Sequence, residues 1–245
     1  MKNRRRQFGF SLVEVLMAVG VLTVGLLMVA GTFPVGIHLV AISTERTLGA
    51  VASDEAFAKI RLYGVDETKL NNSPPCKDFY DVSKYTINDD EFLYPSDPSN
   101  DNRVYSWSAI CRKNSSITND TSAQITVFVS RRVSNALQYY GQDASYAPSG
   151  TSNWPLPNLI GSVTGNQGEN NINVGAANIG YFSDDSVIVD NANGKIYRVI
   201  ELDQAAGVIY LDRKLEDAVS GVWVVPVPIG GGKNPCVGVY QRIID

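Results

Sequence analysis

The sequence predicts an α+β protein in which one long amino-terminal helix packs on the antiparallel β-sheet of a head domain with long loops. Residues 15–42 contain no Asp, Glu, Lys or Arg, and residues 43–63 continue with amphipathic helical spacing. The remainder is rich in Asn, Ser, Gly and Pro, with short β-type runs between turn formers. This change is typical of a helix followed by strands and turns. We therefore divide the chain into a leader (1–9), a helix (10–63) and a head (64–245).

Composition excludes several classes of protein. The 245 residues are 44% hydrophobic and 19% charged, which excludes a disordered or collagen-like chain. The formal charge of −4 gives no overall basic surface, so no nucleic-acid partner is expected. Three cysteines are too few for a disulfide framework. We expect Cys111 to be a buried free thiol, with a Cys76–Cys111 bridge as the alternative and the pairing with Cys236 left open.

Residues 15–42 predict the membrane-spanning half of the helix. Their length exceeds the roughly 20 residues needed to cross a bilayer core. It also exceeds the apolar core of a conventional signal peptide, which is about 7 to 15 residues long. Four basic residues lie within the first six, and the acidic Glu45 follows the apolar run. We therefore expect a cytoplasmic amino terminus, an extracytoplasmic head and contact with membrane lipid.

Glu14 does not fit a simple membrane anchor. An ionised carboxylate at the edge of an apolar run is costly unless it has a partner. It belongs to the sequence GFSLVE, residues 9–14, which directly follows the basic leader.

The segment GFSLVEVLMAVGVLTVGLL resembles the amino terminus of the type IV prepilin and pseudopilin family. Its members share a basic leader ending in Gly, a following Phe, a Glu at the fifth position of the mature chain and an apolar helix. The resemblance implies that a prepilin peptidase cuts between Gly9 and Phe10 and methylates the Phe10 amine. It also implies that Glu14 pairs with the amino terminus of a neighbouring subunit, which offsets the lost solvation of both charges.

The same resemblance implies a pilin-like fold and a structural role. We expect a subunit, a minor pilin or pseudopilin, of a type IV pilus or type II secretion filament, with the pilin-modification type as the subgroup. Other pilin subunits and an inner-membrane assembly platform would be its partners. It would be a single-pass inner-membrane protein before assembly, and periplasmic or extracellular afterwards. The alternative is a membrane-anchored extracytoplasmic binding module, which needs neither Gly9 nor Glu14.

The helix carries two further predictions. Pro34, which lies between Gly31 and Gly36, predicts a kink or a locally unwound stretch, because proline removes a helix hydrogen bond and clashes with the preceding turn. An apolar face at Ala52, Phe57 and Ile60 predicts packing on a sheet. An i,i+4 ion pair between Glu55 and Lys59 is expected beside that face.

Alternation of apolar residues predicts strands at 103–113 and 124–133. One face of these strands is predicted to carry Tyr105, Trp107, Ala109, Cys111, Ile125, Val127 and Val129. The pair Asn193-Gly194 predicts a two-residue hairpin turn. We interpret residues 141–180 as an elaborated loop, and the head as one domain, with two subdomains divided near residue 150 as the alternative.

Catalytic chemistry is not expected. The only histidine, His38, lies in the apolar segment, which excludes a His-dependent triad outside the membrane. A polar side chain that reaches toward the interface is the interpretation of His38. Carboxylates in two clusters could supply glycosidase acids, but solvated loop charges are the preferred interpretation. These carboxylates are Asp89, Asp90, Glu91, Asp184 and Asp185.

No cofactor is expected, and calcium is kept as the alternative because oxygen donors gather at 97–102 and around Asp184 and Asp190. Four basic residues on the two predicted strands could form a basic stripe that captures DNA, although a solvated strand face is the preferred interpretation. They are Arg112, Lys113, Arg131 and Arg132.

Overall fold

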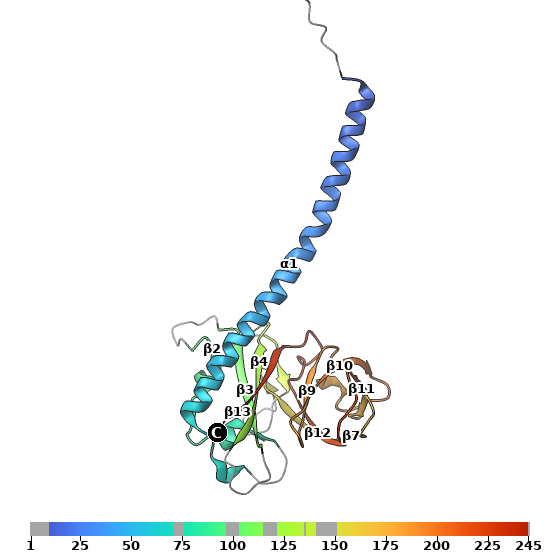
Figure 1. Ribbon diagram of the computed structural model, residues 1–245. Coiled ribbons are helices and arrows are strands. Elements are labelled where there is room, and N and C mark those ends of the chain that lie inside the picture. The colour runs from blue at the N-terminus through green and yellow to red at the C-terminus, as the bar shows by residue number, and fades with distance from the viewer. Residues whose placement is uncertain are drawn as a thin grey trace, which may run out of the picture. The chain divides into compact units, whose positions relative to one another are not determined.

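A computed structural model describes residues 10–70, 76–96, 103–114, 122–134, 136–140 and 151–244. The chain forms two compact units, residues 1–45 and 46–245. Helix α1, Leu12–Tyr63, contributes to both of them. The second unit also contains the head, which consists of a β-sheet and a closed β-barrel (Figure 1).

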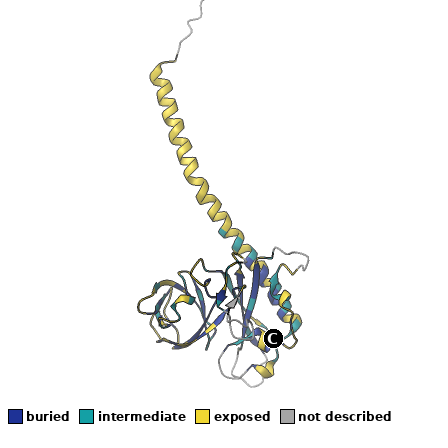
Figure 2. Ribbon diagram, turned by 180° about the vertical axis from the view of Figure 1, so that it is seen from behind, coloured by how far each residue is buried: buried dark blue, intermediate teal, exposed yellow. Residues whose placement is uncertain are grey.

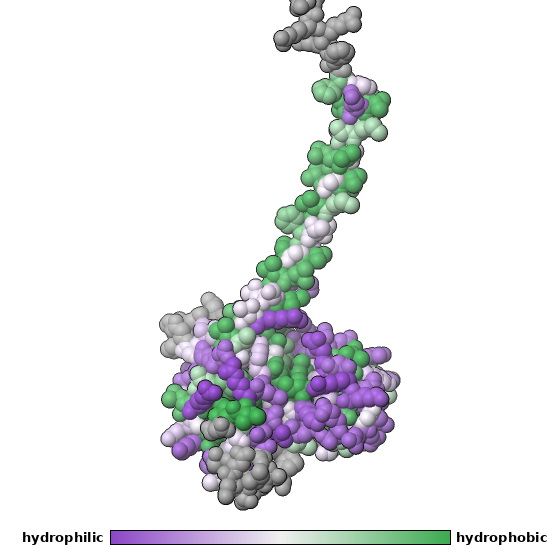
Figure 3. All heavy atoms as spheres, in the orientation of Figure 1, coloured by the Kyte–Doolittle hydropathy of each residue, from purple (hydrophilic) through white to green (hydrophobic). Residues whose placement is uncertain are grey.

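The first half of α1 is an apolar helix with no protein packed on it. Its side chains from Leu12 to Val40 are exposed (Figure 2), and its surface is mostly hydrophobic in Figure 3. Within the described residues, α1 is the one helix long and apolar enough to cross a membrane. The helix continues through Pro34. A locally unwound stretch is therefore absent there, and the kink at Pro34 stays a prediction.

The second half of α1 buries one face. Gly49, Ala52, Ser53, Ala56, Phe57 and Ile60 are its buried residues, which confirms the predicted apolar face. Small residues at Gly49 and Ala52 permit close approach, since a Cβ at Gly49 would lie 3.0 Å from Val237 Cγ1. The expected ion pair is present, with 3.1 Å between Lys59 Nζ and Glu55 Oε1.

The sheet is antiparallel, with strand order β1-β3-β4-β13, and β2 also pairs with β3. Its long strands confirm the two strands predicted by alternation. The bounds are β1 Lys77–Asp78, β2 Leu93–Tyr94, β3 Tyr105–Lys113, β4 Ala123–Arg131 and β13 Cys236–Ile244. Short helices connect the first strands, namely η1 Glu67–Lys69, α2 Phe79–Val82 and η2 Asp89–Phe92.

The two faces of the sheet pack on different partners. One face packs all of the predicted set except Tyr105 against the buried face of α1, namely Trp107, Ala109, Cys111, Ile125, Val127 and Val129. Tyr105 is buried outside this cluster. The other face places Ile110 and Phe128 in a cluster with Val189, Trp223 and Val225 from the barrel side. The long helix packed on an antiparallel sheet confirms the predicted α+β fold.

The barrel closes in the order β10-β11-β8-β7-β12-β9. Its own cluster of buried residues, which includes Ile172, Tyr197 and Ile209, forms a core separate from that of the sheet. The bounds are β7 Asn158–Gly165, β8 Asn171–Asn173, β9 Val187–Asp190, β10 Ile196–Asp203, β11 Val208–Leu211 and β12 Val219–Val224. A smaller pair, β5 Tyr139–Tyr140 and β6 Thr151–Ser152, precedes the barrel, and η3 Ile179–Tyr181 follows β8.

The interpretation of residues 141–180 as a loop is wrong where β6, β7, β8 and η3 form, at residues 151–152, 158–165, 171–173 and 179–181. Residues 141–150 lie outside the described part of the chain. The period-two pattern of β7 is broken because Ser162 has a positive φ of 62°, so Ile160 and Val163 are buried at odd spacing. Gly165 is required by packing, since a Cβ there would lie 2.6 Å from Leu215 Cδ1.

The predicted turn at Asn193-Gly194 joins β9 to β10. Val189 of β9 is opposite Ile196 of β10. Beyond this pair, the Asp190 N–H donates to the Lys195 carbonyl at 2.8 Å. The connection is therefore four residues long, 191–194, and not the predicted two. Gly194 has a φ of 71°, which glycine adopts without strain.

The barrel is inserted between β4 and β13, so the chain leaves the sheet after Arg131 and returns to it at Cys236. Residues 46–245 nevertheless form one compact unit. The head thus contains two cores within one unit, and its second core begins close to the considered division near residue 150.

Candidate processing and assembly site

Phe10 is the first described residue, and its side chain is 87% exposed. Gly9 belongs to residues 1–9, which lie outside the described part of the chain. Cleavage between Gly9 and Phe10 and methylation of Phe10 therefore stay predictions. An exposed Phe10 next to the helix start is compatible with access by an enzyme.

The side chains of Ser11 and Glu14 each accept a backbone N–H at the start of α1. The Ser11 N–H donates to Glu14 Oε2 at 3.1 Å, and the Val13 N–H donates to Ser11 Oγ at 3.4 Å. The Val15 N–H donates to the Ser11 carbonyl at 3.2 Å, which is the first backbone bond of the helix. This arrangement is a capping box, in which a Ser and a Glu three residues apart satisfy backbone donors that the first turn leaves free.

Sequence reasoning found Glu14 from the cost of its charge and included Ser11 in the same motif, but it assigned Ser11 no capping role. The signal was present, because Ser-x-x-Glu directly before an apolar run is the capping-box pattern. Glu14 lies in the first turn of α1, where the helix dipole favours a negative charge. The role of Glu14 toward a neighbouring subunit stays a prediction.

Pro34 is not part of this site. It lies 20 residues after Glu14 in the same helix, which corresponds to about 30 Å at 1.5 Å per residue. His38 is exposed on the same apolar half of α1, and its orientation toward a membrane interface stays a prediction. The structure therefore brings together Phe10, Ser11 and Glu14 and leaves the other singled-out residues of the helix outside.

Several of the head carboxylates form ion pairs. Glu91 Oε2 lies 3.0 Å from Lys59 Nζ, and Asp90 Oδ1 lies 3.0 Å from Arg103 Nη2. Asp185 Oδ1 lies 3.8 Å from Arg198 Nε. Glu91 thereby connects η2 to α1, which is a structural role that loop charges alone would not have predicted.

The basic stripe considered from the sequence is not formed. Arg112 of β3 is opposite Gln124, and Arg131 of β4 is opposite Tyr105. Antiparallel pairing therefore puts Arg112 and Lys113 at one end of the strand pair and Arg131 and Arg132 at the other. Arg131 is level with Tyr105, seven residues from Arg112 along β3, so at about 3.4 Å per residue the two ends are separated by roughly 24 Å.

The cysteines are free thiols in the structure. Lys77 is opposite Cys111, so Cys76 points to the other face of the sheet, where it packs with Ile110 and Phe128. The alternative of a Cys76–Cys111 bridge is therefore wrong, because adjacent positions on paired strands face opposite sides. Burial raises the pKa of Cys76 and of Cys236 to about 12 and that of Cys111 well above its ordinary value. Such thiols are poor nucleophiles.

The calcium alternative stays a prediction. Residues 97–102 lie outside the described part of the chain. Asp190 is fully buried at the end of β9, where its Oδ1 accepts the Ala192 N–H at 2.9 Å. In the described segments, no group of three or more His, Cys, Asp or Glu side chains could hold a metal ion.

An apolar helix with a capped, carboxylate-bearing start, followed by a β-rich head, is the arrangement of a membrane-anchored subunit with an exported head. Residues 4–30 match the model of the prokaryotic N-terminal methylation motif. This match confirms the resemblance to the type IV prepilin and pseudopilin family at the amino terminus, while the pilin-modification subgroup stays a prediction. The motif implies in general terms processing by a prepilin peptidase and assembly with other pilins. No curated protein and no solved structure matches the chain.

Proposed function

We propose that this chain is a structural subunit of a type IV pilus or a type II secretion filament, inserted into the filament from the inner membrane. The observation that carries the proposal is the coincidence of three features in one segment. Residues 4–30 match the methylation motif, Glu14 stands in the first turn of α1, and the apolar half of the helix is unpacked. Filament packing or a bilayer would each cover this surface.

The role of Glu14 in the proposal follows from the cost of its charge. Removing a carboxylate and an ammonium from water as a pair costs less free energy than removing the two charges unpaired. The amino terminus created before Phe10 would supply the ammonium. The proposed pairing is between subunits, and it would set the axial stagger of one helix against the next.

The first experiment is the intact mass of the full chain expressed with and without a prepilin peptidase. We expect loss of residues 1–9 together with a gain of about 14 Da, one methyl group, on the Phe10 amine. Gly9→Val should abolish the cleavage, whereas Gly20→Ala, at a position with nothing within 4 Å, should leave it unchanged. An uncleaved wild-type chain would contradict the proposal.

The second experiment separates a filament subunit from a membrane-anchored binding module. Glu14→Ala should insert into the membrane normally but fail to enter filaments, while Glu201→Ala, on an exposed position of the barrel, should assemble like the wild type. Unchanged assembly of the Glu14→Ala variant would favour the anchored binding module.

A further inference from the structure

Strand β13 is an outer strand of the sheet, and one of its two edges is open. In the order β1-β3-β4-β13 it pairs with β4 alone. The opposite edge of the sheet is occupied, because β1 and β2 both pair with β3, and the barrel is closed. Among the strands that the structure describes, β13 therefore has the one long open edge.

Two hydrogen bonds at the end of β4 show how its residues alternate between the neighbouring strands. The Arg132 N–H donates to the Val104 carbonyl, on the β3 side, at 2.7 Å, and the Arg131 N–H donates to the Pro235 carbonyl, on the β13 side, at 2.8 Å. Successive backbone groups of a strand point to opposite edges. The even-numbered residues of β4 therefore bond to β3, and the odd-numbered residues bond to β13.

The same alternation assigns the backbone groups of β13. Every second residue from Tyr240 to Ile244 lies opposite an odd-numbered residue of β4, so its backbone groups bond to β4. The N–H and C=O groups of the residues in the alternate positions point away from β4, and no described residue provides a partner for them. These outward residues are Val239, Gln241 and Ile243.

The open edge lacks the features that usually protect an outer strand from pairing. Proline, lysine and β-bulges are common protective features. Strand β13 contains no Pro and no Lys, and its register irregularity lies between its first and third residues, before the open stretch. Its one charged residue, Arg242, already has partners on α1, namely Asp54 and the ring of Phe57. Residues 239–244 thus form a template on which another strand can pair.

A pocket lies at the carboxyl-terminal end of the same strand. Its volume is about 450 Å³, and its apolar walls include Ile60, Val65 and the last two residues of β13. One of these two, Ile243, is 56% exposed. Arg61 and Glu67, which have opposite charges, also line the pocket. The pocket therefore has no net charge, and an apolar side chain fits it better than an ionised one.

We propose that β13 is a docking site for an extended segment of another exported polypeptide, which adds to the sheet as an antiparallel strand and places an apolar side chain in the pocket. The outward residues offer three N–H donors and three C=O acceptors, and another extended backbone satisfies them together. Main-chain hydrogen bonds give such a complex its affinity, and a pocket gives it specificity. The inference goes beyond the proposed function, because it concerns the head and not the entry of α1 into a filament.

A second copy of the chain does not fit as the occupant. The second half of α1 runs in the same direction as β13, since Gly49 is next to Val237 and Ile60 lines the pocket beside Ile244. Antiparallel pairing of two β13 strands would therefore reverse α1 of one copy relative to α1 of the other. Two subunits anchored in one membrane have their helices in the same direction, which excludes this pairing.

The first test is amide hydrogen exchange of the full chain in detergent micelles, followed by nuclear magnetic resonance. In the chain alone, we expect the amides of Val239, Gln241 and Ile243 to exchange about tenfold faster, or more, than those of Tyr240 and Arg242, which are bonded to β4. Equal protection of all these amides would mean that the edge is already covered. That result, or protection that increases with the concentration of the chain alone, would overturn the proposal.

The probe for binding is a synthetic peptide with the sequence of β4, AQITVFVSR, because β4 pairs antiparallel with β13 in the structure. When roughly nine tenths of the chain is bound, exchange of the three outward amides should slow about tenfold, because only the free fraction exchanges. The same peptide with proline as its fourth residue is the control and should cause no slowing. Unchanged exchange of the outward amides with the unmodified peptide would overturn the proposal.

The role of the pocket is tested at the first residue of the peptide, which an antiparallel arrangement places at the carboxyl-terminal end of β13. A peptide with Leu there should bind roughly tenfold more tightly than one with Asp, because burial of the leucine side chain is favourable. Equal affinities of the two peptides would refute the placement of an apolar side chain in the pocket.

Ile243 provides a matched pair of variants. Ile243→Pro removes an outward N–H without removing a bond to β4 and should weaken peptide binding about tenfold, whereas Ile243→Val keeps the N–H and should bind like the wild type. If Ile243→Pro does not fold, Ile243→Lys keeps every backbone group and should weaken binding through its charge at the edge. Wild-type affinity in the folded variant that removes the N–H or adds the charge would contradict strand addition at β13.

Discussion

The sheet and the barrel of the head enclose their cores in different ways. The barrel surrounds its core with its own strands, which lie between residues 158 and 224. The core of the sheet includes the second half of α1. The strands of the sheet come from segments of the chain before and after the barrel. The barrel is therefore self-contained, whereas the sheet depends on the helix.

The largest expected effect is on the sheet core. Phe57 is 1% exposed, and the Arg242 guanidinium stacks on its ring at 4.5 Å from the centroid. Phe57→Ala should lower the free energy of unfolding by about 3 to 5 kcal/mol, because the cavity has no side chain to fill it. We would measure urea unfolding of the full chain in detergent by circular dichroism.

Leu62→Ala is the control, because Leu62 is on the same helix but 77% exposed, and its cost should stay within about 0.5 kcal/mol. If the sheet depends on the helix and the barrel does not, Phe57→Ala should separate one unfolding transition into two. A single transition with an unchanged midpoint would show that the helix contributes little to the sheet.

The second effect concerns the barrel core. Gly165→Ala places a Cβ 2.6 Å from Leu215 Cδ1 and 3.0 Å from Ile172 Cγ1, and both neighbours are buried. Overpacking of this kind costs about 1 to 3 kcal/mol. Thermal unfolding is the measurement. Gly161→Ala is a matched control on the same strand, since nothing lies within 4 Å of its Cβ, and equal stabilities of the two variants would refute the packing argument.

The third effect lies between the sheet and the barrel, at Asp190. Burial raises its pKa, with Asp217 contributing to the increase and with the Ala192 N–H, Lys195 and Arg112 opposing it. The folded state therefore keeps the proton to a higher pH than the unfolded state does. The wild type loses stability as the pH rises from about 4 through the folded pKa, at about 1.4 kcal/mol for each unit of pKa shift.

Asp190→Asn cannot ionise and should be more stable than the wild type at pH 7, while the difference should shrink below pH 4. Urea midpoints at the two pH values measure it. Asp184→Asn, at an exposed carboxylate, should leave the pH dependence unchanged. A less stable Asp190→Asn at pH 7 would mean that the carboxylate is favourably bound there.

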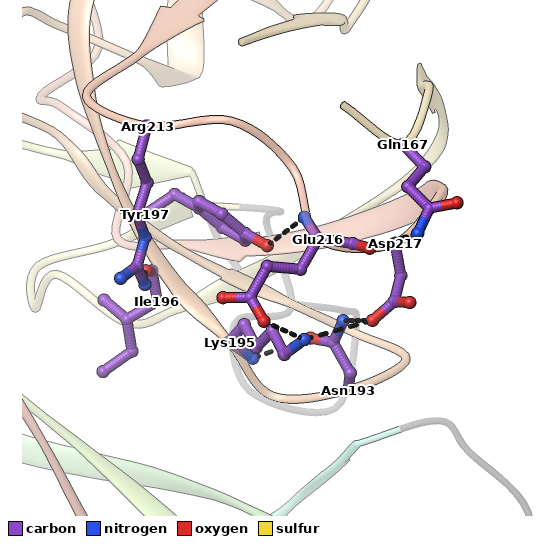
Figure 4. Close-up of polar contacts among 8 residues, drawn as sticks. All are labelled: Gln167, Asn193, Lys195, Ile196, Tyr197, Arg213, Glu216 and Asp217. Carbon is purple, nitrogen blue, oxygen red and sulfur yellow. Dashed lines mark hydrogen bonds and ion pairs between the residues drawn. The ribbon is translucent and has the colours of Figure 1, made fainter. Parts of the chain in front are cut away.

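The smallest effect concerns the end of the barrel shown in Figure 4. Lys195 Nζ lies 2.5 Å from Glu216 Oε2 and 3.2 Å from Asp217 Oδ2, which joins the β9–β10 hairpin to the β11–β12 connection. The hydrogen bond to Glu216 is the main cause of the raised pKa of Lys195. Because these groups are partly exposed, Lys195→Met should lower the melting temperature by no more than about 3 °C.

Salt distinguishes the causes of that decrease. If it is electrostatic, high ionic strength should abolish the difference between the wild type and Lys195→Met, because salt screens exposed pairs. A difference in melting temperature that persists in 1 M salt would instead indicate that the aliphatic part of the Lys195 side chain packs on an apolar surface.

The sheet was predictable from sequence because its residues alternate cleanly. Trp107, Ala109 and Cys111 all face the helix as expected, and the helix face itself follows a regular spacing. The barrel was not predictable at its start. The positive φ of Ser162 interrupts the alternation of β7, and β8 has only three residues. The closure of the barrel, and not the local sequence pattern, therefore determines where these two strands form.

The site was predictable in part for a similar reason. The energetic cost of Glu14 follows from its position at the edge of the apolar run, and the Ser-x-x-Glu pattern signals a helix start at Ser11. Which atoms make the contact is known only from the structure. The pairing of Lys77 with Cys111 likewise depends on strand register. No local signal fixes that register, and it alone decides that Cys76 and Cys111 face opposite sides.

The insertion of the barrel between β4 and β13 also has a kinetic consequence. Strand β13 pairs with β4 from Cys236 and Ser130 to Ile244 and Ala123, so contacts that close the sheet span more than a hundred residues of chain. Contacts of such sequence separation form slowly. We therefore expect the barrel to fold first and the sheet to be completed only after β13 has emerged, so that the edge of β4 that pairs with β13 stays open in the interval.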